Sequence, residues 1–326
     1  MRMHEEAEKM RRSGRVEAAV RFLNEEIARG NGQAALTLAL WRVHGDTIRR
    51  DLAEATRLFS VAAGLGCVEA EEPYAALLAS GAGQSTREWN LALEQLRKRT
   101  ANDAFADLQL RLLSRMAVDD QGEPAQEFAP RFICQDPLVV AFDAFLTDEE
   151  CDALIMMAET KFAPSRVINP ATGKLVSNPV RTSYAAAFPL VEENPFLHAI
   201  NRRIAAASRS RYEQGEPTQI LSYVSGQEYK LHSDAIAGES NQRIQTFLIY
   251  LTDDFAGGET HFPAADLKLR PAKGGAICFS NVTADMEPAR TSVHAGLPVT
   301  AGRKIVLSKW IRRYPLDLAG PPGKPF

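Results

Sequence analysis

The spacing of apolar residues divides this chain into two parts. In residues 1–118 apolar side chains recur three and four positions apart, as in residues 16–27 and 52–62, which is the period of a helix that buries one face. From residue 220 onward the apolar runs are short, rich in β-branched residues, and separated by turns such as Gly257-Gly258. We therefore predict an all-α first part and a β-rich second part.

The first part contains helix–turn–helix units at a regular interval. Gly45 and Gly81 each follow an Ala- and Leu-rich helix and precede a polar turn and a second helix. Because one such unit cannot bury its apolar face alone, neighbouring units stack into the continuous core of a solenoid. A nonspecific helical bundle is the alternative. The units resemble tetratricopeptide or Sel1-like repeats in the residues Asp51-Leu52-Ala53-Glu54-Ala55, Phe59, Ala62-Ala63 and Gly66.

A polar, proline-containing linker over residues 119–135 is predicted to separate this helical domain from a second domain over residues 136–316. The second domain should contain a helix from Thr147 to about Lys161, because Thr147 and Glu150 form a capping box. Its many short strands between glycine and proline turns indicate a sandwich or barrel, and we expect a double-stranded β-helix (jelly roll) with flanking helices. The remaining predicted elements are a helix over residues 195–208, strands over 220–223, 244–251, 267–269, 276–279 and 305–310, and a flexible tail over 317–326.

The composition is that of an ordinary globular protein. The chain has 326 residues and a formal net charge of −3, and neither part carries a sustained basic patch, so no nucleic-acid partner is expected. The charged N-terminus lacks the apolar stretch of a signal peptide, and no apolar run is long enough to span a membrane, so a cytoplasmic protein without membrane contact is expected. The four widely spaced cysteines are expected to be free, mostly buried thiols, which excludes a thiolate zinc site.

One short motif suggests a metal site. In His232-Ser233-Asp234 the period of two on an extended chain places His232 and Asp234 on one face. Taken alone, the motif is weak, and a surface or capping pair is the alternative. A third, distant histidine would complete the facial triad of a non-haem Fe(II) oxygenase, and His294 is the candidate. Lys304 begins an apolar strand and requires an anion if it points inward; otherwise it is a lysine at the solvent-exposed rim.

The second domain resembles 2-oxoglutarate-dependent dioxygenases of the prolyl 4-hydroxylase type over about residues 136–316. The matching segments have the residue types and spacings of that family's metal segments, glycine-rich turn and closing strand. They are Tyr223-x-x-Gly226-Gln227-x-Tyr229-x-x-His232-x-Asp234, Arg243-x-x-Thr246, Tyr250-Leu251, Gly257-Gly258-Glu259-Thr260-x-Phe262-Pro263, Lys273-Gly274, Phe279-x-Asn281, His294-Ala295-Gly296-x-Pro298-Val299, Gly302-x-Lys304 and Lys309-Trp310-Ile311.

The resemblance implies the chemistry and the residues that perform it. It implies an Fe(II)- and 2-oxoglutarate-dependent hydroxylase that uses O₂, decarboxylates 2-oxoglutarate to succinate and uses ascorbate as reductant. The implied catalytic residues are the Fe(II) ligands His232, Asp234 and His294, together with Lys304, which would pair with the distal carboxylate of 2-oxoglutarate. Tyr223 and Thr260 would assist Lys304 by hydrogen bonds.

The resemblance also implies a substrate-binding side, which is formed by Arg181, Glu216, Tyr229, Arg243 and Trp310. Each of these residues has a structural alternative: Arg181 and Arg243 could be surface residues, Tyr229 and Trp310 could be core residues, and Arg181 and Glu216 could pair with each other. Arg312 replaces a histidine that often follows Trp-Ile in the family, and a polar segment over residues 167–178 could be a mobile lid.

Three hypotheses follow for the whole chain. The first is a prolyl hydroxylase that acts on a peptide or protein, since helical repeats present an extended surface suited to peptides and collagen-type prolyl hydroxylases also combine such repeats with this domain. The second is a hydroxylase of a small molecule or free amino acid, in which the repeats serve oligomerisation, for example as a homodimer. The third, from a different class, is a binding module that has lost activity.

Overall fold

The computed structural model describes residues 2–168, 175–177 and 180–316 of the chain. The predicted tail and most of the predicted lid lie outside the described residues. The described residues form two compact units. We call residues 2–125 with 189–200 the helical unit, and residues 126–188 with 201–316 the sheet unit.

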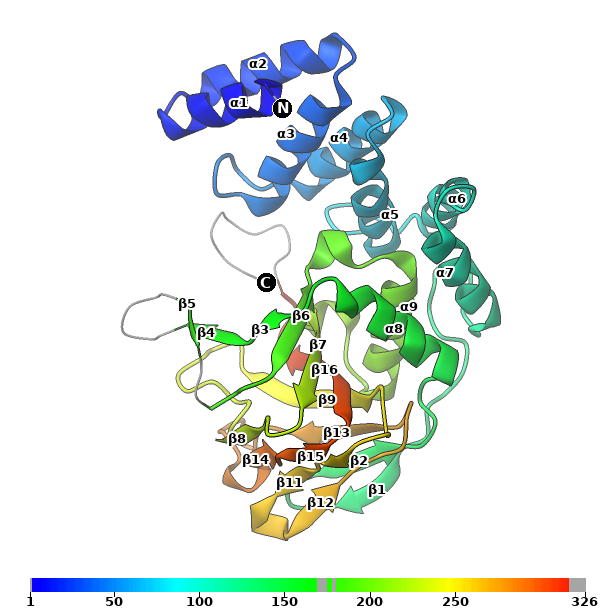
Figure 1. Cartoon of the computed structure of the whole chain (residues 1–326), viewed down its shortest axis with the longest axis vertical. Coiled ribbons are helices and arrows are strands. Elements are labelled where there is room, and N and C mark those ends of the chain that lie inside the picture. The colour runs from blue at the N-terminus through cyan, green and yellow to red at the C-terminus, as the bar shows by residue number, and fades with distance from the viewer. Residues whose placement is uncertain (1, 169–174, 178–179, 317–326) are drawn as a thin grey trace. The chain divides into compact units, whose positions relative to one another are not determined.

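The helical unit consists of consecutive helices in which each packs against the next (Figure 1). Gly45 and Gly81 end α3 and α5 in the left-handed conformation, with φ of 73° and 68°, as expected of glycines that terminate helices. Asn31, Asp51 and Asp103 cap α3, α4 and α7 by accepting hydrogen bonds from backbone N–H groups. The helices are α1 (Arg2–Arg12), α2 (Val16–Ala28), α3 (Gly32–His44), α4 (Leu52–Gly64), α5 (Glu71–Ser80), α6 (Trp89–Arg99) and α7 (Ala104–Arg115), with 3-10 turns at Val68–Ala70 and Leu190–Glu192.

Small side chains hold these helices close together. The buried faces of α3, α4 and α5 are rich in alanine, and larger residues such as Leu58 and Phe59 fill the remaining space. Alanine combines high helix propensity with a small volume, which favours helices and permits close approach. The predicted all-α character of this part is confirmed.

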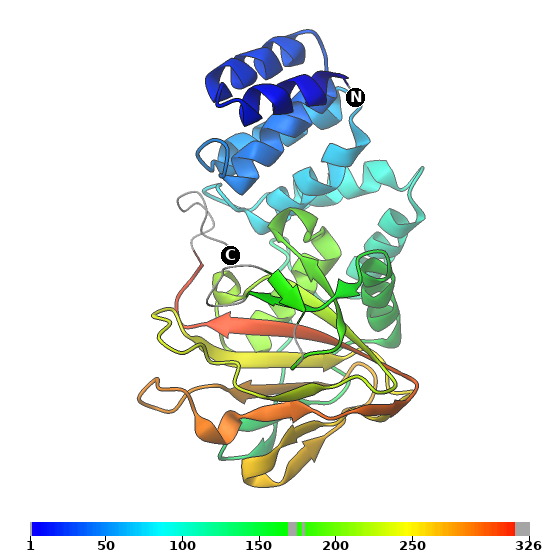
Figure 2. The same cartoon turned by 60° about the vertical axis from the view of Figure 1, so that its left-hand side comes forward.

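The core of the sheet unit is an eight-stranded antiparallel sheet in the order β1-β2-β13-β9-β16-β7-β6-β3. Its two central strands, β9 and β16, run side by side (Figure 2). All residues of β16 between its two end residues are buried, and the second half of β9 is mostly buried, as expected of strands with neighbours on both sides. The strands are β1 (Arg131–Cys134), β2 (Val139–Phe142), β3 (Ala163–Pro164), β6 (Tyr184–Phe188), β7 (Thr218–Val224), β9 (Arg243–Tyr250), β13 (Ala276–Ser280) and β16 (Arg303–Arg312).

A second sheet of four strands, in the order β12-β11-β14-β8, carries two of the three predicted metal ligands. An antiparallel core of two main sheets is consistent with the predicted jelly roll. Two further pairs of strands, β4 with β5 and β10 with β15, complete the unit. The strands are β8 (Tyr229–His232), β11 (Thr260–Phe262), β12 (Leu267–Leu269), β14 (His294–Gly296), β4 (Arg166–Ile168), β5 (Leu175–Ser177), β10 (Ala256–Gly257) and β15 (Val299–Ala301).

The sheet unit also contains α8 (Asp148–Glu159), which contacts β6 and β7, and the second half of α9 (Pro195–Ala207), whose first half belongs to the helical unit. The predicted capping box of Thr147 and Glu150 is present at the start of α8. The Glu150 carboxylate also accepts two hydrogen bonds from the guanidinium of Arg203 at 2.8 and 2.9 Å. This buried ion pair joins α8 to α9 within the sheet unit.

The predicted strands are all present, with ends that differ by at most two residues. Strand β6 was not predicted because its sequence, Tyr-Ala-Ala-Ala-Phe, has the composition of a helix. Pairing of β6 with β7 and β3 overrides that preference. Strand β1 lies within the segment predicted as a linker and pairs with β2.

The cysteine prediction is confirmed. Cys67, Cys151 and Cys278 are buried, Cys134 is partly buried, and all four thiols are free. Across the described ranges, no helix combines the length and apolarity that a membrane crossing requires.

Candidate metal and cosubstrate site

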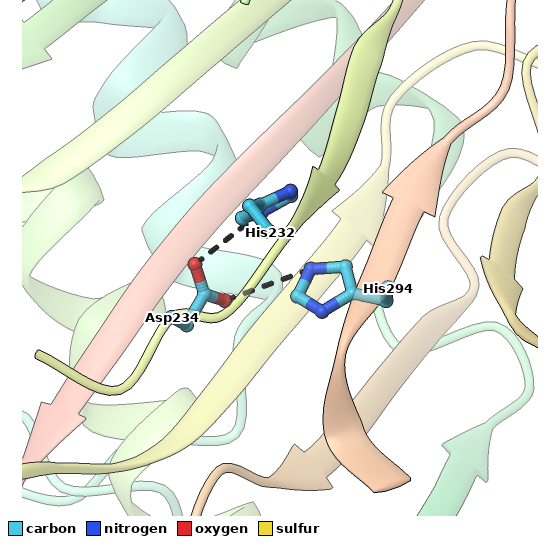
Figure 3. Close-up of side chains that lie close together, drawn as sticks. All are labelled: His232, Asp234 and His294. Carbon is cyan, nitrogen blue, oxygen red and sulfur yellow. Dashed lines mark ion pairs between the residues drawn. The ribbon is translucent and has the colours of Figure 1, made fainter. Parts of the chain in front are cut away.

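His232 and His294 face each other across two neighbouring strands. His232 ends β8, His294 begins β14, and the two residues are direct partners in the antiparallel pairing. Direct partners project to the same face of a sheet, and the two imidazole centroids lie 4.3 Å apart. The loop after β8 then brings Asp234 to the same place, so the three side chains converge (Figure 3).

Both histidines present the same ring nitrogen to this centre. Nδ1 of His232 lies 2.8 Å from the carbonyl oxygen of Lys230, and Nδ1 of His294 lies 3.0 Å from that of Ser292. A carbonyl can only accept, so in each neutral ring Nδ1 carries the proton and Nε2 keeps a lone pair. Burial lowers the pKa of His294 to about 4, which keeps this ring neutral at neutral pH.

The Asp234 carboxylate lies between the two histidines. Its Oδ1 is 3.6 Å from Nε2 of His232, and its Oδ2 is 3.7 Å from Nε2 of His294. Burial alone would raise the pKa of Asp234, but its interactions with His232, His294 and Thr246 outweigh burial and hold the pKa below its usual range. Asp234 is therefore an anion at neutral pH.

These three residues fit a divalent metal ion. One ligand atom from each residue lies within 4.8 Å of the others, and Asp234 and His294 are buried. Two neutral imidazoles and one carboxylate form the donor set of non-haem Fe(II) sites, in which three protein ligands leave positions open for a cosubstrate and O₂.

Lys304 lies in the same cavity and is buried. It is the partner of Tyr223 in the pairing of β16 with β7, so both side chains point to the same face of the large sheet. Its Nζ donates a hydrogen bond to the carbonyl oxygen of Gly258 at 2.6 Å, and among the described residues it forms no ion pair. Burial lowers the pKa of Lys304 to about 8. A buried ammonium without a carboxylate partner is a site that favours an anion.

Aromatic and hydroxyl groups surround the Lys304 ammonium. Nζ lies 5.5 Å from the ring centroid of Tyr223 and 5.1 Å from that of Tyr250. The hydroxyl of Tyr250 and Oγ1 of Thr260 are hydrogen-bonded at 2.7 Å. Gly258 has a φ of +70°, and a Cβ there would lie 3.2 Å from Cδ of Lys304, so glycine allows the backbone to approach the lysine.

One cavity contains the three metal-ligand candidates, Lys304 and the two residues expected to assist it. Of the five residues expected on the substrate side, Tyr229 and Trp310 also line this cavity. Sequence reasoning missed several apolar and small residues of its wall, which come from central strands and lack chemical signals of their own. The lining residues are Leu221, Tyr223, Tyr229, His232, Asp234, Leu248, Thr260, His294, Gly296, Lys304, Val306, Ser308 and Trp310.

The suggestion that Arg181 and Glu216 pair is wrong. Both oxygens of Glu216 accept hydrogen bonds from Arg243, at 2.6 and 2.8 Å, and its Oε1 also accepts one from Arg312 at 2.5 Å. The guanidinium of Arg243 covers the ring of Trp310 at 3.8 Å. Arg243 and Arg312 lie at the same end of the large sheet as Glu216, because the start of β9, the end of β16 and the end of the loop before β7 meet there.

Arg181 takes neutral partners instead. Its Nε donates to Oγ of Ser183 at 3.2 Å, and its NH2 group donates to Oε1 of Gln219 at 3.3 Å. Its guanidinium lies 5.5 Å from the ring centroid of Tyr229, and the Tyr229 ring stacks on His232 at 3.4 Å. Arg181 is buried and therefore is not a surface residue.

Three comparisons with known proteins bear on this site. The model of the family described as "2OG-Fe(II) oxygenase superfamily" matches residues 218–312. "Prolyl 4-hydroxylase 1" of Arabidopsis thaliana is 35% identical over 225 residues, which cover 63% of this chain and 80% of that protein. "Prolyl 4-hydroxylase 5" of the same plant is 34% identical over 55% of this chain and 69% of its own length. The 2OG complex of the viral collagen prolyl hydroxylase of Paramecium Bursaria Chlorella virus-1 is 29% identical, covers 56% of this chain and 99% of that chain, and has a TM-score of 0.45.

Proposed function

Because the chain belongs to the prolyl 4-hydroxylase family of 2OG-Fe(II) oxygenases, we propose that it hydroxylates prolyl residues of a peptide or protein while 2-oxoglutarate is decarboxylated to succinate. The observation that carries this proposal is the cavity in which two histidines and an aspartate converge beside a buried lysine that forms no ion pair among the described residues. A site that contained only the metal donors would fit many metalloproteins, whereas Lys304 adds a place for the distal carboxylate of 2-oxoglutarate.

In this proposal Fe(II) is held by Nε2 of His232, Nε2 of His294 and the carboxylate of Asp234. When bound together with 2-oxoglutarate and O₂, the metal supplies the oxidising chemistry that inserts one oxygen atom into a C–H bond of the substrate. The protein supplies orientation. Backbone carbonyls hold the protons on Nδ1 of both rings, so the Nε2 lone pairs need no proton loss before they bind a metal.

Lys304 is proposed to hold 2-oxoglutarate by its distal carboxylate. The ammonium is buried, so its attraction for a carboxylate is only weakly screened by water. Tyr223 covers one side of the ammonium. Thr260, whose hydroxyl is paired with that of Tyr250, is proposed to complete the carboxylate's hydrogen bonds.

The peptide is proposed to lie over Tyr229, Trp310 and the guanidinium of Arg243. Tyr229 stacks on the metal-ligand candidate His232 and faces Arg181, so a prolyl ring held against Tyr229 would be close to the metal. Arg243 stacks on Trp310 while Glu216 fixes its guanidinium. A flat aromatic wall braced by a stacked guanidinium suits the apolar ring of proline.

Turnover with a proline-containing peptide tests the proposal. The full chain, Fe(II), 2-oxoglutarate and such a peptide should yield succinate together with peptide that has gained one oxygen atom on a prolyl residue, as located by mass spectrometry. The matched control is the same peptide with alanine in place of proline, which should gain no oxygen. Succinate formation that no proline-containing peptide increases would contradict the prolyl substrate and would favour a small molecule or free amino acid. Ascorbate is proposed as the reductant that sustains Fe(II), and omitting it should shorten the linear phase of turnover.

The helical unit is proposed to be a tetratricopeptide- or Sel1-like repeat domain over residues 1–118 that presents a surface to the peptide substrate. What supports this is the recurrence of helix, left-handed glycine and second helix at Gly45 and Gly81. Use of the repeats for a homodimer is the alternative. Sedimentation of the full chain distinguishes them, because a concentration-dependent dimer whose mass is unchanged by peptide favours the oligomerisation role.

A further inference from the structure

Thr246 contacts the carboxylate of Asp234 from the centre of the large sheet. It lies in β9, is fully buried, and has Phe279 of β13 and Trp310 of β16 as its strand partners. Its Oγ1 lies 2.6 Å from Oδ2 of Asp234. An ionised carboxylate can only accept hydrogen bonds, so the single hydroxyl proton of Thr246 must point to Asp234.

Asn281 determines the direction of this contact from the other side. Its Nδ2 lies 2.9 Å from Oγ1 of Thr246. Because the Thr246 proton is already given to Asp234, Thr246 can only accept here, and Asn281 must present its amide N–H rather than its oxygen. Asn281 is itself held in place, since its backbone N–H donates to Ile244 and its carbonyl accepts from Ala289. The hydrogen bonds therefore run in one direction, from Asn281 to Thr246 to Asp234.

This chain connects two layers of the sheet unit. Asp234 lies in the loop after β8 of the small sheet, whereas Thr246 belongs to β9 of the large sheet and Asn281 directly follows β13 of that sheet. A carboxylate in a loop can rotate about its bond to Cβ, and rotation would exchange the two oxygens. The bond from Thr246 occupies Oδ2 and leaves Oδ1 on the side of His232, 3.6 Å from its Nε2.

We propose that Thr246 and Asn281 are positioning residues that fix the Asp234 carboxylate for metal binding, with Oδ2 occupied by the hydroxyl and Oδ1 offered to the ion. This inference rests on the proposed metal site and adds two residues to it. Partners that orient a metal ligand in this way typically contribute 10- to 100-fold in metal affinity. If the buried hydroxyl of Thr246 had only a structural role, its loss would affect folding and leave the metal affinity unchanged.

The test measures metal binding without turnover. Mn(II) is titrated into the full chain without 2-oxoglutarate, and free Mn(II) is followed by electron paramagnetic resonance to give a Kd. Thr246→Val, which keeps the shape and removes the hydroxyl, should raise the Kd at least about 10-fold. Thr246→Ser, which restores the hydroxyl, should remain within about threefold of wild type. In the Co(II) form, the visible absorption of Thr246→Val should differ from wild type, and that of Thr246→Ser should match it.

Thr218→Val is the matched control. Thr218 is equally buried, and its hydroxyl also receives one hydrogen bond, from Lys309, and donates one, to Asn201. It does not line the cavity that contains the metal-ligand candidates, so its substitution should leave the Mn(II) Kd unchanged. A Thr246→Val protein that binds Mn(II) like wild type, or a Thr246→Ser protein no better than Thr246→Val, overturns the proposal.

Two further variants make each outcome decisive. If Thr246→Val does not fold, Asn281→Leu takes its place, because it removes the donor to Thr246 without touching the hydroxyl; an unchanged Kd in Asn281→Leu overturns the proposal. Asp234→Ala tests the proposed metal site, on which the positioning role of Thr246 and Asn281 rests. If Asp234→Ala binds Mn(II) as wild type does, the proposed function itself fails. If Asp234→Ala loses Mn(II) while Thr246→Val does not, only the positioning role fails.

Discussion

The charged residues around the cavity fall into two sets that differ in where their partners are found. In the set that we call open, Lys304 is a buried ammonium that forms no ion pair among the described residues, and His232 and His294 keep Nε2 lone pairs directed at the cavity. Asp234 is an anion with one oxygen occupied by Thr246. Each of these groups has bonding capacity that the described protein does not use.

The set that we call closed consists of Glu216, Arg243 and Arg312. Here one carboxylate accepts hydrogen bonds from two guanidinium groups at 2.5 to 2.8 Å, so opposite charges are paired within the chain. Both sets combine a carboxylate with basic side chains. The difference teaches that an unused lone pair or charge indicates a ligand, whereas a saturated ion pair indicates a scaffold that shapes the cavity wall.

The largest effect is expected from Asp234→Ala, which removes the anion of the open set. Formation of succinate from 2-oxoglutarate should fall below detection, because the metal loses a charged ligand between two histidines. The unfolding midpoint of the metal-free chain should fall, because the interactions of Asp234 with His232, His294 and Thr246 outweigh the cost of burying its charge. Succinate assays and thermal unfolding of the metal-free chain measure the two quantities. Turnover near the wild-type rate would show that Asp234 is not a metal ligand.

A smaller effect is expected from Lys304→Met. The KM for 2-oxoglutarate should rise about 100-fold, because a charge-assisted bond to a buried carboxylate contributes about 1.5–3 kcal/mol. The free energy of unfolding should stay the same or increase, because an apolar side chain replaces an unpaired buried charge. Steady-state kinetics and chemical denaturation measure the pair. A KM that does not change would place 2-oxoglutarate elsewhere.

Glu216→Gln should show the opposite pattern. Two guanidinium groups lose the carboxylate that they share, so the free energy of unfolding should fall by about 2 kcal/mol, the contribution of a charge-assisted hydrogen bond. The KM for 2-oxoglutarate should be unchanged, since Glu216 does not line the cavity. Denaturation measured beside Lys304→Met gives the contrast directly. If both variants change stability in the same direction, the division into open and closed sets is wrong.

The smallest effect is a pH dependence that belongs to the open set. The pKa of Lys304 is lowered to about 8 by burial, so the free enzyme loses the ammonium charge as the pH rises through that value. For 2-oxoglutarate, kcat/KM should therefore be near its maximum at neutral pH and fall about tenfold per unit well above pH 8. In Lys304→Arg, whose guanidinium stays charged, this decline should disappear. A decline that persists in Lys304→Arg would come from another group.

The parts of the site that were predictable from the sequence are local. His232 and Asp234 are two positions apart, so the motif itself suggested that they act together, although Asp234 lies in the loop after β8 and not on the strand. Thr147 and Glu150 predicted the start of α8 from an equally short spacing. The glycines that end α3 and α5 were likewise predictable from the sequence as helix-terminating residues. Interactions between near neighbours in sequence depend little on how the rest of the chain folds.

The parts that were not predictable depend on which strands become neighbours. Thr246 and Asn281 stood in the matching motifs, yet nothing in the sequence indicates that Asn281 hydrogen-bonds Thr246 and that Thr246 hydrogen-bonds Asp234. The partner of Glu216 could not be identified among several arginines, because Arg243 and Arg312 reach it only through the pairing of β9 with β16. Long-range pairing also explains why an alanine-rich segment became strand β6.

The direct pairing of His232 with His294 has a consequence for how the small sheet assembles. A slip of one residue between β8 and β14 would turn one of the two imidazoles to the opposite side of the sheet. Misaligned chains would then lack the chelating pair, whereas correctly aligned chains would gain the full binding free energy of the ion. The metal ion would thus also favour the correct register of β8 and β14 during folding. Chains that fold in the presence of the ion should therefore be more uniform in this register than chains that fold in the presence of a chelator.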